Sequence, residues 1–150
     1  MTSAGRFTVG VFQDVEWARR GVEALLRDGF VPESLTIIAR ESPDAASLIE
    51  ATLGGPGERV ELKELGAAVA RGPLVAALQA NDAGLTQLGL GSTITRAGFQ
   101  RHDGHIFETL TGKGGILVAV RSEPRAADAL ATLHAYGGGN AAIGAWTGRV

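Results

Sequence analysis

The sequence predicts one mixed α+β domain, built from two β-α-β halves with a long insertion between them. Two observations lead to this fold class. Each end of the chain shows a short β-rich run, an amphipathic helix and a second β-rich run, and the two helices are nearly equal in length. The 150 residues fit a single domain, and a chain of this size buries roughly 70% of its unfolded surface.

The first half covers about residues 6–40. Its strand-like run FTVGVF is followed by a helix in which apolar residues recur at helical spacing, namely Val15, Ala18, Val22, Leu25 and Leu26. Asp14 is a plausible N-cap, and Gly29 stands where a helix C-terminal glycine belongs. The run ESLTIIAR supplies the second strand. Two i,i+4 pairs in the favourable order predict a solvated outer face: Glu16–Arg20 and Glu23–Arg27.

The second half covers about residues 114–147. GGILVAVR is typical of a buried strand, and the helix in SEPRAADALATLHAYGGG has Pro124 suited to its first turn and Gly137 at its end. The predicted inner face of this helix carries Ala126, Leu130 and Leu133. NAAIGAW then predicts a last, apolar strand. At a sheet edge such a strand needs covering, and a second subunit is one natural cover.

The insertion covers about residues 41–113, is glycine-rich and is predicted to be mostly helical. It begins with a short helix in PDAASLIEATL, a turn at GGPGE and a possible strand in RVELKEL. Gly72-Pro73 then predicts a helix start, and DAGLTQLG a short amphipathic piece. With two helices covering one face of four strands, the whole pattern indicates a ferredoxin-like sandwich.

The last part of the insertion, Thr95 to Thr111, predicts one kinked helix or two shorter ones meeting at Gly104. One face of it carries Phe99, His102, Ile106 and Leu110. The glycines from Gly112 to Gly115 predict a turn into a strand over 116–120.

The HDGH stretch offers the ligand types that zinc, nickel or iron use, in His102, Asp103, His105 and, one turn on, Glu108. No HExxH or similar signature surrounds these residues, which makes them low-priority metal candidates. Because His102 shares a face with Phe99 and Ile106, a partly buried structural histidine is favoured, with Asp103 as a helix cap.

Other motif-like stretches do not predict a catalytic residue or a cofactor. TGKGG lies between a helix and a following strand, the reverse of a phosphate-binding loop, so Lys113 is expected to offset a helix dipole. GLGSTI lacks the last glycine of a dinucleotide fingerprint, and no GxSxG elbow supports Ser92 or Thr93 as nucleophiles. Trp17 and Trp146 are expected to pack in the core or at a sheet edge.

The charge, cysteine and apolar content of the chain exclude several kinds of partner, chemistry and location from the expectations. Fourteen basic and sixteen acidic residues are mixed along the chain, so nucleic acid is not expected as a partner. The absence of cysteine removes thiolate chemistry and disulfides. No apolar stretch reaches the roughly 18 residues of a membrane span, and a cytoplasmic location is expected.

Three stretches together resemble the bacterial general-stress proteins that carry the heat-induced stress protein domain. They are TVGVFQDVEWARRGVEALLRDGF with ESLTIIAR, AAVARGPLVAAL, and GGILVAVRSEPRAADALATLHAYGG. The resemblance implies a ferredoxin-like domain, a stress-associated setting and no established enzymatic activity. The central segment is shorter and more polar here than the helical segment of many such proteins.

Three functions follow as hypotheses. The leading one is a non-enzymatic stress-response protein that acts through self-association, with a dimer favoured, or through a protein partner. The alternative is a small-molecule-binding regulatory module, with a pocket bordered by helix C-terminal glycines and the insertion. The third is a metal-dependent enzyme that uses His102, Asp103 and His105.

Overall fold

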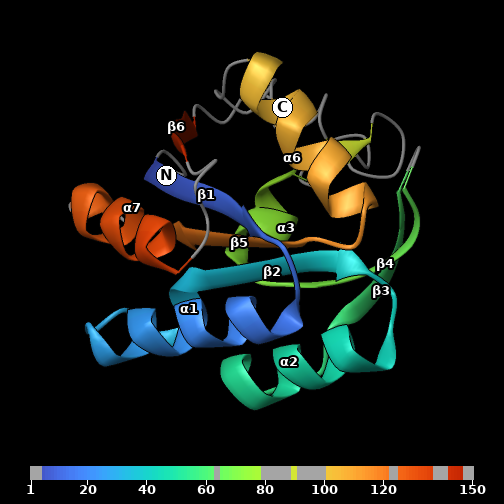
Figure 1. Cartoon of the computed structure of the whole chain (residues 1–150), viewed down its shortest axis with the longest axis horizontal. Helices are drawn as coiled ribbons and strands as arrows, with labels where there is room; N and C mark the ends of the chain where they lie inside the picture. Colours follow the sequence, from blue (N-terminus) through green and yellow to red (C-terminus); the bar gives the residue numbers. More distant parts are fainter. Residues whose placement is uncertain are drawn as a thin grey trace.

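The computed structural model describes residues 5–62, 65–78, 89–90, 101–121, 125–136 and 142–146. These form a mixed α+β structure around one antiparallel sheet of six strands in the order β3-β4-β2-β5-β1-β6 (Figure 1). The strands are β1 Gly5–Phe12, β2 Leu35–Arg40, β3 Glu58–Leu62, β4 Gly66–Arg71, β5 Ile116–Arg121 and β6 Ala142–Trp146. The helices are α1 Val15–Arg27, α2 Pro43–Leu53, α3 Pro73–Leu78, α6 Arg101–Gly112 and α7 Ala126–Ala135, with a short 3₁₀ turn η1 at Pro32–Ser34.

The α+β class predicted from the sequence is therefore confirmed, and both ends of the chain run strand–helix–strand, as β1-α1-β2 and as β5-α7-β6. The four strands of these two segments lie together in the order β2-β5-β1-β6. Strand β5 pairs antiparallel with both β1 and β2, so β1 and β2 run parallel to each other with β5 between them. Each end of the chain thus contributes two strands that are not direct neighbours.

The insertion is not only helical between its ends. It contributes a β3–β4 hairpin, which pairs with β2 through β4 and extends the sheet at that side. Strand β3 overlaps the predicted run RVELKEL but begins one residue earlier, whereas β4, GAAVAR, is a strand that was not predicted from the sequence. Alanine and glycine are poor strand formers, so here pairing with β2 and burial of Ala68, Val69 and Ala70 override local propensity.

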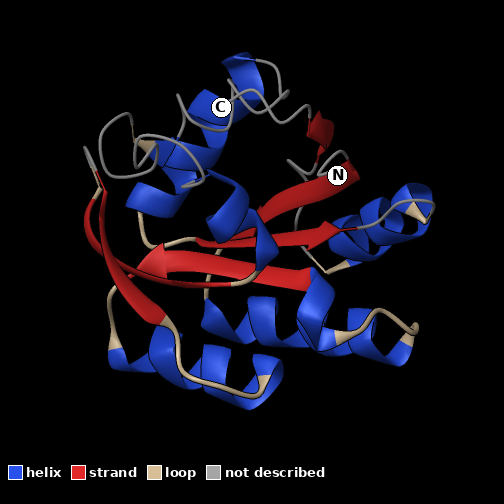
Figure 2. Cartoon of the chain, turned by 180° about the vertical axis from the view of Figure 1, so that it is seen from behind, coloured by secondary structure: helices blue, strands red, loops and turns tan. Residues whose placement is uncertain are grey.

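Helices cover both faces of the sheet, so the expectation of one covered face is wrong. Helices α1 and α2 lie below the sheet in Figure 1 and α6 lies above it, and Figure 2 shows the same layers from behind. One core contains buried residues of α1, α2 and α7, among them Leu25, Ile49 and Leu133. The other core contains buried residues of α3 and α6, among them Leu74 and Phe107.

The two central strands of the sheet, β2 and β5, explain why a layer of helices is needed on each face. In both β2 and β5, five consecutive residues are buried and only the final arginine is exposed. Because successive side chains of a strand point to opposite faces, such a run needs cover on both sides. The second layer is supplied by α3 and α6, both from the insertion.

Both ends of α1 have the capping residues that the sequence predicts. The Asp14 Oδ1 atom accepts a hydrogen bond of 2.9 Å from the Trp17 N–H, as an N-cap does. At the other end, Gly29 adopts φ of 102°, and the Phe30 N–H donates to the Leu25 carbonyl at 3.1 Å. This is a Schellman-type C-terminus, which turns the chain toward η1.

The outer face of α1 carries a network of ion pairs that differs in part from the predicted one. Glu16 contacts Arg20 as expected, at 3.0 Å, and it also contacts Arg19. Glu23 pairs with Arg19 at 3.2 Å rather than with Arg27. Trp17 is half-buried against the core with Arg20 over its ring, so its predicted packing role is confirmed. The side chain of Trp146 lies outside the described residues.

Helices α1 and α7 are tied to each other at one end. The Arg125 guanidinium donates to the Asp28 carbonyl at 2.9 Å and lies over the Phe30 ring, 4.4 Å from its centroid. The Thr132 hydroxyl donates to the Asp28 carboxylate at 3.0 Å. Among the described side chains of α7, Ala129 and Leu133 are buried and Leu130 is only half-buried, while the side chain of Ala126 lies outside the described ones. Pro124 and Gly137 lie outside the described residues.

The stretch HDGHIFETLTGKGG forms one uninterrupted helix, α6, followed by a turn. Gly114 adopts φ of 100°, and the Gly115 N–H donates to the Leu110 carbonyl at 2.9 Å, which closes the helix and starts β5. The predicted turn is therefore confirmed, and Arg40 donates to the Gly112 carbonyl at 3.2 Å beside it.

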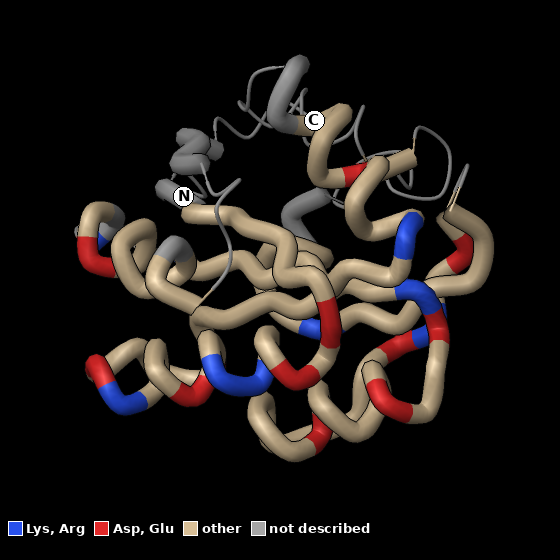
Figure 3. Tube along the Cα trace, viewed as in Figure 1, with Lys and Arg blue, Asp and Glu red and all other residues tan. Residues whose placement is uncertain are grey.

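The side of α6 that faces the sheet is rotated from the predicted one. Gly104, Phe107 and Thr111 are buried, whereas Ile106 and Leu110 are only half-buried, and Phe99 lies outside the described residues. In the described part of the chain, no helix is long and apolar enough to cross a membrane. Basic and acidic residues are interspersed over the described trace (Figure 3).

Candidate ligand-binding groove

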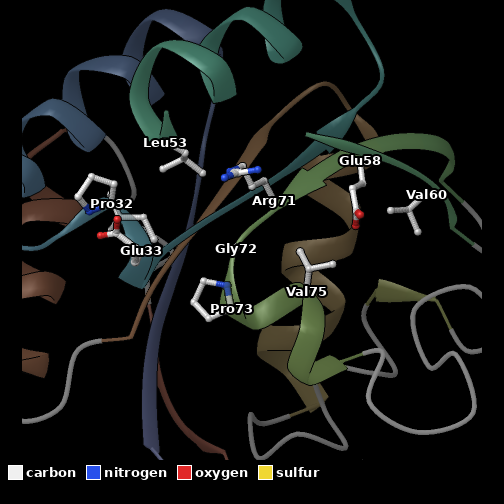
Figure 4. A pocket seen from close by; sticks show the side chains of 10 residues that line it. Pro32, Glu33, Leu53, Glu58, Val60, Arg71, Gly72, Pro73 and Val75 are labelled. Atoms are coloured by element: carbon white, nitrogen blue, oxygen red, sulfur yellow. The ribbon is translucent and has the colours of Figure 1, made fainter. Parts of the chain in front are cut away.

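A groove of about 620 Å³ opens beside β4, where the hairpin, β2 and α3 meet. Its walls come from η1, the start of β2, the end of α2, strands β3 and β4, and the start of α3 (Figure 4). The lining residues are Pro32, Glu33, Leu35, Leu53, Glu58, Val60, Arg71, Gly72, Pro73 and Val75. Most of these walls belong to the insertion, so the groove is built mainly by the part of the chain between the two ends.

The walls of the groove are largely apolar. Leu53 and Val75 are core residues that are 8% exposed at the groove, Leu35 lines it from a fully buried position, and Val60 is half-buried beside them. Val31, next to the lining residue Pro32, is 54% exposed. Among the described residues, it is the one large apolar side chain that is exposed to solvent. Apolar walls of this kind supply affinity for carbon-rich ligands.

Arg71 is the cationic group of the groove, and the loop after α2 holds it. Its Nη1 donates to the Pro56 carbonyl at 3.0 Å. A Cβ atom added to Gly55 would lie only 2.9 Å from the Arg71 Nη2, so the guanidinium rests against the bare backbone of Gly55. Guanidinium has five N–H donors, and the described residues supply Arg71 with this single acceptor. The remaining donors are available to a ligand.

Glu33 and Glu58 lie on opposite sides of Arg71 in the groove (Figure 4). Glu58 stands opposite Ala70 in the β3–β4 register, one residue before Arg71, while Glu33 comes from η1. Within the described ranges, none of the ion pairs joins either carboxylate to Arg71. The groove therefore combines one guanidinium with two carboxylates that it does not neutralise internally.

The floor of the groove is fixed by the turn from β4 into α3. Gly72 adopts φ of 131°, and a Cβ atom there would lie 2.3 Å from the Leu35 carbonyl oxygen. The buried Thr36 hydroxyl accepts a hydrogen bond of 2.9 Å from the Leu74 N–H and so caps α3 from the neighbouring strand. The predicted helix start at Gly72-Pro73 is confirmed, and its close contact with β2 keeps Pro73 and Val75 at the groove.

The metal candidates from the sequence are not brought into this groove. His105 is exposed and Glu108 is half-buried on α6, while the side chains of His102 and Asp103 lie outside the described residues. Over the residues that the structure describes, no group of three or more His, Asp or Glu side chains could hold a metal ion. Lys113 is exposed at the C-terminal end of α6, and Ser92 and Thr93 lie outside the described ranges.

Sequence reasoning missed Arg71 as a site residue. The available signal was the glycine-rich run GGPG, which can lie close to another side chain, and the RGP turn after an apolar run. Neither signal says which residue the loop approaches. Comparisons with family models, with curated proteins and with solved structures gave no match for this chain.

Proposed function

We propose that this protein is a small-molecule-binding module whose groove holds a ligand with an acidic group and an apolar body. The observation that carries the proposal is Arg71, which is held at the groove by Pro56 and Gly55 with most of its donors unused. A guanidinium binds a carboxylate through two parallel hydrogen bonds, and one that is already positioned loses little entropy on binding.

The surroundings of Arg71 support this function. A volume of about 620 Å³ lies in the range of roughly 300–1,000 Å³ typical of small-molecule sites. The apolar walls would gain about 25 cal/mol for each Å² of ligand and wall surface removed from water. The groove also lies beside Gly54, the C-terminal glycine of α2, and is lined mainly by the insertion, which supports the hypothesis of a regulatory binding module.

The test uses octanoate and octanamide, which share an apolar body and differ in charge. Isothermal titration calorimetry is expected to show that octanoate binds more tightly than octanamide. Arg71→Gln should weaken octanoate binding about 10- to 100-fold, the loss expected for hydrogen bonds to a charged group. Arg59→Gln is the matched control, because Arg59 lies outside the groove and contacts Glu41 and Glu61. Equal binding of the two probes, or no effect of Arg71→Gln, would contradict the proposal.

Self-association through β6 is a second candidate function, and a contrast between the sheet edges favours it. The β3 edge, ERVEL, carries three charged residues, which protect an edge from pairing. The β6 edge, AIGAW, carries none, and among the described strands β6 pairs only with β1. A second copy could add its own β6 there and continue the antiparallel sheet.

Native mass spectrometry tests the dimer. We expect the unmodified chain to show a dimer and Ala145→Lys, which places a charge on the β6 edge, to shift it toward monomer. Glu61→Lys changes a charge on the already charged β3 edge and should leave the proportion of dimer unchanged. A monomer in the unmodified chain at high concentration would rule this candidate out.

The finer fold assignment and the biological setting are also proposals. The strand order β2-β5-β1-β6, with α1 and α7 as connections, supports a ferredoxin-like unit extended by the β3–β4 hairpin. The resemblance to general-stress proteins supports a bacterial stress-response role in the cytoplasm. A metal-dependent activity of His102, Asp103 and His105 stays a hypothesis, and metal retention by a His102→Phe variant would test it.

A further inference from the structure

We infer that the groove selects zwitterions, namely short apolar peptides with a free ammonium and a free carboxylate group. This inference rests on the proposed function, because the ligand carboxylate would again be bound by Arg71. The inference adds an ammonium group to the ligand and places that group beside the carboxylate of Glu58 or Glu33.

The charges of the groove lead to this ligand class. One guanidinium stands between two carboxylates on opposite walls, and the described residues contain no cation paired with either of them. A ligand that carries only a negative charge is attracted by Arg71 and repelled by both Glu33 and Glu58. A ligand with an ammonium group can reverse one of these repulsions, because it places a positive charge beside a carboxylate. The charge pattern therefore favours a zwitterion over a ligand that carries only a carboxylate.

The size and apolar lining of the groove favour a short peptide over a single amino acid. At about 620 Å³, the groove has room for a ligand of drug-like size, which a free amino acid does not reach. Apolar residues lie on both sides of Arg71, with Leu53 on one side and Val60 on the other (Figure 4). Two apolar side chains of a dipeptide can occupy these two sides while the carboxylate lies at Arg71.

The experiment compares three probes that share the same two leucine side chains by isothermal titration calorimetry at about 50 mM salt, where screening of exposed charges is modest. Leucyl-leucine has both charges, N-acetyl-leucyl-leucine has only the carboxylate, and leucyl-leucinamide has only the ammonium group. We expect leucyl-leucine to bind at least tenfold more tightly than either capped peptide.

Variants assign the two charged ends. Arg71→Gln should remove the preference for leucyl-leucine over its amide. Replacing Glu58 and Glu33 together with glutamine should bring leucyl-leucine and its N-acetyl form to within about twofold of each other. Glu61→Gln is the control, since Glu61 is on the same strand as Glu58 and contacts Arg59 rather than lining the groove. All of these positions are exposed, so folding is preserved.

The outcomes separate this inference from the proposed function. If N-acetyl-leucyl-leucine binds as tightly as leucyl-leucine, the zwitterion inference is wrong and the acid-binding groove stands. The same holds if octanoate binds and none of the three peptides does. If neither octanoate nor any peptide binds, both proposals fall.

Discussion

Thr36 and Thr111 are both fully buried, but only the Thr36 hydroxyl has a hydrogen-bond partner among the described residues. The Thr36 hydroxyl, between β2 and α3, accepts a hydrogen bond from the Leu74 N–H at 2.9 Å. The Thr111 hydroxyl, on the inner side of α6, has no hydrogen-bond partner among the described residues. A buried polar atom without a partner has lost its hydration and gained nothing in exchange.

We therefore expect opposite effects from the same substitution. Thr111→Val, which keeps the shape and removes the hydroxyl, should raise the free energy of unfolding by about 1 kcal/mol. Thr36→Val should lower it by about 1–3 kcal/mol, because the Leu74 N–H loses its acceptor. Urea unfolding of the two variants checks this pair. If Thr111→Val were as destabilising as Thr36→Val, its hydroxyl would have a partner after all.

At the scale of residues, the sequence predicts what depends on near neighbours. The Asp14 cap and the Gly29 terminus were predicted because each bonds within a few positions of the chain. Arg71 was not predicted, because its acceptor, Pro56, is fifteen residues away. The loop that brings Pro56 to Arg71 is placed by α2 and the β3–β4 hairpin, so the contact exists only in the folded chain.

At the scale of the helix, α1 has a charged outer face that lowers the pKa of Glu16. Hydrogen bonds from Arg19 and Arg20 stabilise the ionised carboxylate and hold its pKa below the ordinary value of 4.5. A carboxyl group with a lowered pKa in the folded state stabilises the fold above its unfolded pKa. That contribution is lost as the pH falls through the lower, folded value.

Glu16→Gln should therefore lower the melting temperature at pH 7 by a small amount. The difference from the unmodified chain should narrow as the pH falls from 4.5 through the lower pKa of the folded state, below which Glu16 is protonated in both states. Calorimetric melting curves from pH 7 to pH 2 measure this. The difference should also shrink in 1 M salt, since these side chains are about half exposed. A difference independent of pH would assign the effect to helix propensity instead.

Helix α6 shows a limit of periodicity within one element. Of the predicted row, His102, Ile106 and Leu110 lie in α6, on a stripe that neighbours the observed row of Gly104, Phe107 and Thr111. Both contain apolar residues, so helical spacing alone cannot choose between them. Packing against the sheet decides between them, because Phe107 is fully buried in a core with Val9, Ile38 and Leu117.

At the scale of the whole molecule, the second layer of helices, α3 and α6, shares a core with the sheet and is expected to contribute to its stability. Phe107 is fully buried between α6 and the sheet, in the core that also contains Val9, Ile38 and Leu117 from three strands. Removing its ring therefore leaves a cavity at the centre of the molecule.

Phe107→Ala is expected to lower the free energy of unfolding by about 3–5 kcal/mol. His105→Ala, an exposed position on the same helix, should change it by no more than about 0.5 kcal/mol. Denaturant unfolding followed by circular dichroism and by tryptophan fluorescence measures both. A small loss in Phe107→Ala would mean that α6 contributes little to the stability of the sheet.

The sequence by itself determined the elements with local causes: the helices with their caps, the apolar runs of β2 and β5, and the glycine turn that joins α6 to β5. Only the tertiary structure decided that the insertion adds a hairpin to the sheet, covers its second face and forms a groove around Arg71. The physical reason is the separation along the chain of the residues that interact. Caps, turns and periodicity act over a few residues, whereas strand pairing, layer coverage and the approach of Gly55 to Arg71 join segments far apart in the chain.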